Sequence, residues 1–166
     1  MAISKIQSES LNLADTFAFT GTVTGTGVNT PTVLVRATTA TTFATNAYVK
    51  TTLDNEFIDT DNLFSNSRFT VTSGYEGKYL VNWRISFNFS STTQFAQSPI
   101  YKNGSIHAYG QHYSGRSVNH TMMSEVTYVI DMTTNDYLEF YGRQSDSSRN
   151  NNTGNLTHAW ITKLIT

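Results

Sequence analysis

One alternating segment constrains the fold of this chain more than any other feature. From Lys78 to Phe89 the odd positions carry the large apolar side chains of Tyr79, Val81, Trp83, Ile85, Phe87 and Phe89, and the even positions are mostly polar. An alternation of period two is typical of a β-strand with one buried face and one solvated face. The segment therefore predicts a long strand in a sheet, and the apolar side of that sheet needs a second layer to cover it.

Shorter runs rich in β-branched and aromatic residues lie on both sides of this strand, with turn-forming residues between them. The strands expected besides it are 32–37, 68–72, 99–102, 105–113, 125–130, 137–142 and 156–165. The pair Asn103-Gly104 is a strong local hairpin signal. No long amphipathic helix is expected. The pattern predicts an all-β protein, an antiparallel sandwich or barrel.

Composition excludes several classes of function. The 166 residues suit one domain with a short extension, and the chain contains no cysteine, which excludes a disulfide scaffold and a thiolate metal site. The net charge is −1 and only 14% of residues are charged. A chain with this charge attracts the phosphate backbone of a nucleic acid only weakly, so nucleic acid is not an expected partner. No stretch is apolar and long enough to span a bilayer, and no membrane partner is expected.

Residues 1–32 differ in amino-acid composition from the rest of the chain and are predicted to be an anchoring arm. The apolar positions expected to anchor it are Ile3, Ile6, Leu11, Leu13, Phe17, Phe19 and Val23. Phe17, Phe19 and Val23 alternate with small polar residues and form one apolar side, which needs a partner surface. That surface is another subunit or a particle shell. The alternative is an extra strand packed on the chain's own domain, residues 33–166.

Four ordered motifs carry a resemblance to a known family. Arg68–Val71 followed by Gly77–Val81, the hairpin Tyr101–Gly104, Asn135–Phe140 and Asn155–Ile161 resemble successive strands of the complement C1q-like jelly roll, a relative of the tumour necrosis factor fold. The motif at Asn135 has Asn where the family has Gly, and the closing strand lacks the usual Ser-Gly pair. The resemblance covers about residues 33–166. It implies an antiparallel jelly-roll sandwich that forms a homotrimer.

The run from Lys5 to Val23 also resembles the leaders of fibre-like proteins from marine and cyanobacterial phages. Collagen-like repeats and a heptad stalk are missing from the sequence. The two resemblances imply a non-enzymatic phage virion protein: a trimeric capsid decoration or cement protein on the outer surface of the particle, assembled in the host cytoplasm. Its partner would be the major capsid protein or another virion protein. The alternative is a receptor-binding knob of a head or tail fibre.

Tyr109, His112, Tyr113 and Arg116, with the loop 145–152, are candidates for surface recognition of a host glycan or receptor. Tyrosine and asparagine contribute contact area and hydrogen bonds at low entropic cost. The alternative for the aromatic residues is packing between subunits, and for the loop a solvated tip.

No motif for catalysis or for a cofactor is found, and neither is expected. A polysaccharide depolymerase would need a pair of carboxylates in a cleft, and the sequence offers no clear pair. One acidic cluster comprises Asp54, Glu56, Asp59 and Asp61; its spacing fits no EF-hand, and a solvated loop is favoured over a calcium site. The histidines His107, His112, His120 and His158 are interpreted as surface or interface residues rather than metal ligands.

Overall fold

The computed structural model describes residues 30–90, 94–115 and 119–164. Within these ranges the secondary structure consists of strands, and none of it is helical. The strands are β1 (Thr32–Ala37), β2 (Thr42–Phe43), β3 (Val49–Lys50), β4 (Asn55–Asp59), β5 (Phe64–Ser65), β6 (Arg68–Thr70), β7 (Gly77–Phe89), β8 (Gln94–Lys102), β9 (Ser105–Ser114), β10 (His120–Met132), β11 (Tyr137–Gln144), β12 (Arg149–Asn150) and β13 (Gly154–Lys163). A membrane-spanning helix is accordingly not found in the described part of the chain.

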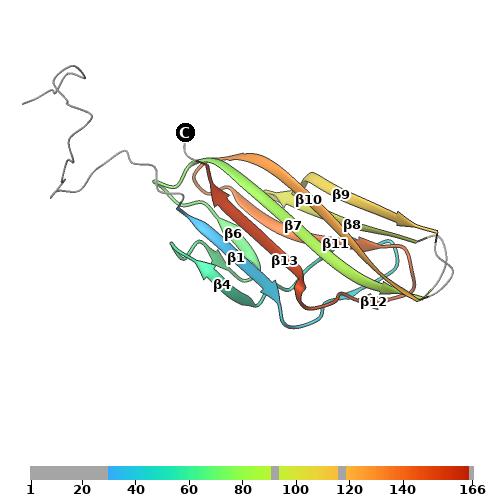
Figure 1. The fold of residues 1–166 in the computed structure, drawn as a ribbon. Coiled ribbons are helices and arrows are strands. Elements are labelled where there is room, and N and C mark those ends of the chain that lie inside the picture. The colour runs from blue at the N-terminus through green and yellow to red at the C-terminus, as the bar shows by residue number, and fades with distance from the viewer. Residues whose placement is uncertain (1–29, 91–93, 116–118, 165–166) are drawn as a thin grey trace, which may run out of the picture.

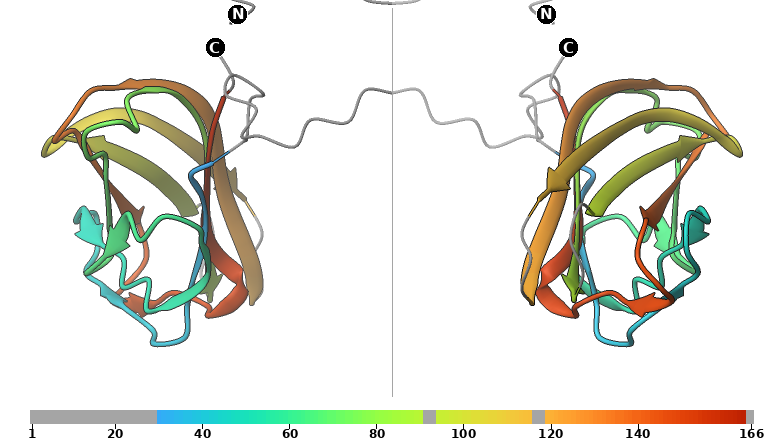
Figure 2. Two further views of the ribbon diagram at one scale, coloured as in Figure 1. Left: turned by 90° about the vertical axis from the view of Figure 1, so that its left-hand side faces the viewer. Right: turned by 90° about the vertical axis from the view of Figure 1, so that its right-hand side faces the viewer.

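Two sheets form the layers of a sandwich (Figures 1 and 2). The first, called sheet I, has the strand order β10-β7-β13-β1-β4, and the second, sheet II, has the order β5-β6-β11-β8-β9 with β3 beside β11. Every strand pairing is antiparallel. Strands distant in sequence, such as β1 and β13, lie side by side. The antiparallel all-β sandwich predicted from the sequence is confirmed.

The core lies between the sheets, and β7 supplies its largest side chains. The odd positions of this strand, which the alternation assigned to one face, are at most 1% exposed. The ring of Trp83 packs on Phe140 of β11 across the sandwich, with the ring centroids 5.4 Å apart. Phe87 meets Phe43 edge-to-face at 5.1 Å. Each such ring removes a large apolar area from water, so the long strand of sheet I is the main source of stabilising burial.

Two turns singled out in the sequence lie together at one end of the sandwich. Asn103 and Asn135 both have positive φ, 51° and 70°, in the left-handed region that asparagine tolerates in tight turns. The Asn103 amide donates to the Asp136 carboxylate at 2.6 Å and accepts from the Tyr137 backbone N–H at 2.9 Å. Lys102 completes the cluster with an ion pair of 2.9 Å to Asp136. The two hairpins therefore fix each other.

This cluster predicts loss of stability in acid. Burial raises the pKa of Asp136, but hydrogen bonds from Lys102, Thr133 and Asn103 outweigh it and hold the pKa well below its usual value. A depressed carboxyl pKa contributes stability above the unfolded-state pKa, about 4, and that stability is lost as the pH falls through the folded-state pKa. We expect the urea midpoint to fall steadily between about pH 5 and pH 2. Asp136→Asn should flatten this profile, and an equal slope in the variant would contradict the assignment.

The strand positions expected from sequence agree with the structure, with differences at the ends. β10 begins at His120 and β8 at Gln94, both earlier than expected, while β13 covers Gly154–Lys163. The short strands β2, β3, β4, β5 and β12 were not expected. β1 begins at Thr32, the last residue of the predicted arm, and residues 1–29 of that arm, with its apolar positions Ile3 to Val23, lie outside the described residues.

Candidate binding surfaces

The outward side of sheet I carries an unusual number of exposed apolar side chains. We call this set the apolar face: Ile58, Met123, Val129, Leu156 and Trp160, between 39% and 47% exposed. The set follows from strand alternation, because the neighbours of Trp160 in β13 point into the core and are fully buried. No described strand covers this side of the sheet (Figure 2). Exposed apolar side chains gathered on one side of a sheet make that side a candidate for contact with another molecule.

The polar groups among these apolar side chains bond to one another. The Asn82 amide donates to Glu125 at 2.6 Å and to Thr127 at 2.9 Å. Burial lowers the pKa of His158, and the positive charge of Arg84 lowers it further. The imidazole is therefore neutral near pH 7. Arg36, Arg84 and Glu125 lie in register with His158 across the same side of the sheet, so a partner that covers the apolar face would also have to accommodate charged groups.

A second surface lies where the edge strands of the two sheets meet. Gly110 of β9 lies so close to β10 that a Cβ placed there would be 2.0 Å from the backbone oxygen of Glu125. Beside this contact Ile106, Tyr109 and Tyr128 are 43%, 58% and 49% exposed. We call these three residues the edge surface. Both strands end their sheets, so the edge surface also offers backbone groups without a strand neighbour.

The structure places the three described candidates for recognition on opposite sides of β9. Tyr109 and Tyr113 lie on the outward side of β9, and Tyr113 packs on Phe95 with a ring-centroid distance of 5.9 Å. His112 belongs to the opposite side of the strand. It lines a cleft of about 340 Å³ with the described residues Ser114, His120, Thr121, Met122 and Met123. Arg116, the fourth candidate, lies outside the described residues.

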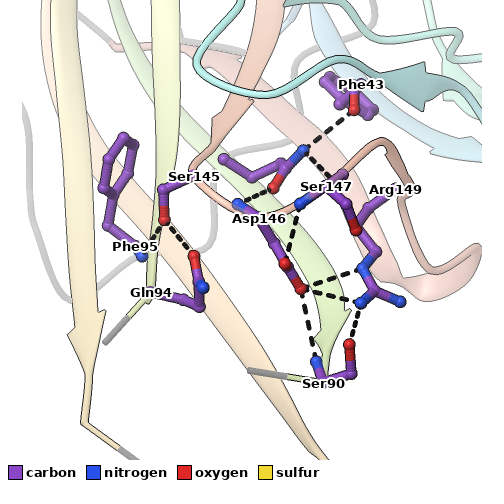
Figure 3. A network of polar contacts seen from close by, with 9 residues as sticks. Phe43, Ser90, Gln94, Phe95, Ser145, Asp146, Ser147 and Arg149 are labelled. Atoms are coloured by element: carbon purple, nitrogen blue, oxygen red, sulfur yellow. Dashed lines mark hydrogen bonds and ion pairs between the residues drawn. The ribbon is translucent and has the colours of Figure 1, made fainter. Parts of the chain in front are cut away.

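The loop 145–152 is held by a dense polar network (Figure 3). The Asp146 carboxylate is 10% exposed and forms an ion pair of 2.9 Å with Arg149, which also bonds to Ser90. Gln144 donates to the backbone oxygens of Phe43 and Ser147 at 3.0 and 3.1 Å. These contacts tie the loop to β2 and to the end of β7. Within the loop Ser147, Ser148 and Asn150 remain exposed.

The cleft beside this loop has a volume of about 500 Å³ and polar walls. Its described lining comprises Asn88, Phe89, Ser90, Asn119, His120, Thr121 and Arg149. Its cation Arg149 is paired with the carboxylate of Asp146. No carboxylate is among the described residues that line this cleft.

Two of the acidic residues considered for calcium accept hydrogen bonds from backbone N–H groups. Asp54 accepts from the backbone N–H groups of Thr38 and Thr39 at 2.6 and 3.0 Å, and Asp59 accepts from those of Leu63 and Phe64. Within the described ranges no three histidine or acidic side chains are grouped as metal ligands would be. These carboxylates fix the loops around β4.

The outward side of sheet II differs from the apolar face of sheet I, because most of its aromatic rings are tyrosines, which end in a hydroxyl group. Tyr101 and Tyr141 stack with centroids 3.9 Å apart, and Arg143 lies over the rings of Tyr48 and Phe95, 5.0 Å from each. The sequence reasoning missed this group. A signal was present in β11, where Tyr137, Glu139, Tyr141 and Arg143 occupy alternate positions. Their alignment with Tyr48 and Phe95 depends on strand pairing that the sequence does not display.

Comparisons with known proteins identify the fold. No protein-family model and no curated protein sequence matches the chain. Solved structures, in contrast, match the chain in their three-dimensional fold. Murine APRIL at pH 5.0 aligns with a TM-score of 0.59 at 10% identity, over 80% of this chain and 98% of that one. The globular domain of zebrafish complement 1qA aligns with a TM-score of 0.57 at 13% identity, over 82% and 97%. Eiger TNF from S. frugiperda gives 0.56 at 12% identity, over 80% and 91%.

The chain has a C1q/TNF-like jelly-roll fold. This confirms the fold implied by the motifs at Arg68, Tyr101, Asn135 and Asn155. Identities between 10% and 13% establish architecture alone. Function has to come from the surfaces that this particular sequence places on the jelly roll.

Proposed function

We propose that this chain is a non-enzymatic virion surface protein, a homotrimeric capsid decoration protein anchored to a phage particle by residues 1–32. The observation that carries the proposal is the apolar face on sheet I. A small sandwich that keeps Trp160, Val129 and Met123 in water would be prone to unspecific association. Covering them with a second copy of the chain removes this apolar area from water.

Two features favour a closed ring of three copies. The apolar face and the edge surface are different places on one molecule, so a contact between them is head-to-tail and not symmetric about a twofold axis. Such contacts close into rings when the rotation per copy permits it. The resemblance to C1q-like heads favours three copies. The trimer would also protect the unpaired edges of β9 and β10 from other strands.

Substitution on the apolar face should weaken association without unfolding the monomer. Trp160→Ala removes the largest exposed ring of that face, and aromatic anchors at the centre of an interface typically contribute about 2 kcal/mol or more. We therefore expect the association constant to fall by at least about 30-fold. Sedimentation equilibrium measures it. Tyr48→Ala, a ring of equal exposure on the other sheet, is the matched control and should leave the trimer intact. Wild-type protein that is monomeric at tens of micromolar would overturn the proposed assembly.

The attachment to a virion is supported by the apolar spacing of Ile3 to Val23 and by the resemblance of the leader to phage fibre proteins. A chain lacking residues 1–25 should still fold and associate, and should no longer bind capsids. Co-sedimentation with particles that lack the protein measures binding. Normal incorporation of the truncated chain would exclude anchoring by this segment.

A second candidate function is a receptor-binding knob, favoured by Tyr109 and Tyr113, which are 58% and 68% exposed on the outward side of β9. The isolated protein should then bind host cells, and Tyr113→Ala should reduce that binding. Particles that infect normally without the protein would argue against this function and leave decoration as the better assignment.

A further inference from the structure

The outward side of sheet II holds a row of aromatic rings and a guanidinium group, beside the edge surface. We call it the ring row: Tyr48, Phe95, Tyr101, Tyr141 and Arg143. Tyr141 and Arg143 occupy alternate positions of β11, and Phe95 and Tyr101 come from the neighbouring β8. Tyr48 precedes β3, which pairs with the other side of β11. Neighbouring strands thus bring side chains from three parts of the sequence onto one side of the sheet.

The rings of this row hold each other in place. Tyr101 stacks on Tyr141, with an interplanar angle of 27°, and meets Tyr48 edge-to-face at 6.4 Å. Arg143 donates to the backbone oxygen of Asn46 at 3.0 Å and to the Gln97 side chain at 3.2 Å. The surface is therefore organised before any ligand arrives, and binding would immobilise few side chains.

The charge of this surface is positive. Lys50 and Arg68 share a single carboxylate, Glu139, at 2.9 and 2.8 Å. No described carboxylate forms an ion pair with Arg143. Three cationic side chains therefore face one anion, although the whole chain carries a net charge of −1. An anionic ligand fits this surface, and the unpaired guanidinium of Arg143 is the natural partner of a carboxylate.

The shape and polarity of the ring row favour a sugar chain over a protein. Three of its rings end in hydroxyl groups, and Gln97 and Gln111 lie beside them, bonded to each other. Few aliphatic groups are exposed here, in contrast to the apolar face of sheet I. Tyrosine rings offer an apolar face to the C–H groups of a pyranose and a hydroxyl to its oxygens. Two excess charges are few for the phosphate chain of a nucleic acid.

We propose that the ring row binds an acidic polysaccharide, with uronate rings against Tyr48 and Tyr101 and a carboxylate on Arg143. The proposal does not depend on the virion role, and its residues belong neither to the apolar face nor to the edge surface. It assigns a ligand class to a surface that lies next to the exposed Tyr113 but is not the set of residues expected from the sequence.

Affinity electrophoresis of the full chain tests this proposal, with polygalacturonate, dextran or a single-stranded oligonucleotide cast in the gel. We expect retardation by polygalacturonate alone, and less of it as salt is added, because the contact is partly ionic. Arg143→Gln should weaken the binding by about tenfold, since a charge-assisted contact is lost. Tyr48→Ala, a second variant at a more exposed position, should weaken the binding of polygalacturonate as well.

Arg36→Gln is the matched control, because Arg36 lies over the ring of Phe57 at 4.4 Å on the other sheet. It should bind polygalacturonate as the wild type does. Thermal unfolding of each variant identifies any that fails to fold. No retardation of the wild type would overturn the proposal. So would equal retardation by dextran, retardation by the oligonucleotide alone, or equal losses in Arg143→Gln and Arg36→Gln. Each of these results leaves the decoration function standing, since sedimentation and capsid binding test that separately.

Discussion

Trp83→Ala is expected to destabilise the fold by about 3–5 kcal/mol, because it empties the centre of the core. Trp83 is fully buried, packs on Phe140 and donates from its indole nitrogen to the backbone oxygen of Tyr141 at 2.8 Å. The substitution leaves a cavity between the sheets and removes that hydrogen bond. Urea unfolding at one fixed protomer concentration measures the change, because association would add to the apparent stability.

Trp83→Phe separates the two contributions. It keeps most of the ring volume and removes the indole N–H, which leaves a part-buried backbone oxygen without this donor. A loss of about 1–2 kcal/mol is expected. If Trp83→Ala costs no more than Trp83→Phe, the ring contributes little, and β7 is not the centre of the core.

Gly110→Ala is expected to cost about 3 kcal/mol or more and to abolish the edge surface. The added Cβ would lie 2.0 Å from the backbone oxygen of Glu125 and 2.9 Å from the hydroxyl of Ser98. A backbone atom cannot turn aside as a side chain can, so β9 and β10 must separate. Their separation also strains the buried hydrogen bond of 3.1 Å between Ser98 and Ser124. Unfolding and sedimentation measurements should both change.

Gly115→Ala is the matched control, because no atom lies within 4 Å of a Cβ placed there. Its stability should stay within about 0.5 kcal/mol of the wild type. Close agreement between the Gly110 and Gly115 variants would show that the two strands are further apart than the structure places them.

Much of the fold was predictable because its signals are local. The alternation from Tyr79 to Phe89 identified the central strand, and Asn103-Gly104 identified a hairpin that the structure contains. The first half of β10 carried no such signal. Its inward positions include Ser124, which is buried because it bonds to Ser98 of β8 and not because it is apolar. Reading only apolar periodicity therefore shortened this strand.

The candidate surfaces were less predictable. Tyr109, His112 and Tyr113 were grouped by closeness in sequence, but successive residues of a strand face opposite ways, so the structure separates His112 from the two tyrosines. Tyr48 and Arg143 are far apart in sequence and meet through the pairing of β3 with β11. Contacts of this kind are set by which strands are neighbours.

The amino-acid sequence by itself determined the longer strands, the hairpin turn at Asn103-Gly104 and the buried side of the longest strand. These depend on side-chain alternation and on turn residues within a few positions of each other. Only the tertiary structure decided that Trp160 lies on an uncovered apolar face and Tyr141 in a row of rings. The exposure and the neighbours of a side chain on a sheet are set by strands from distant parts of the chain, and no local pattern encodes that pairing.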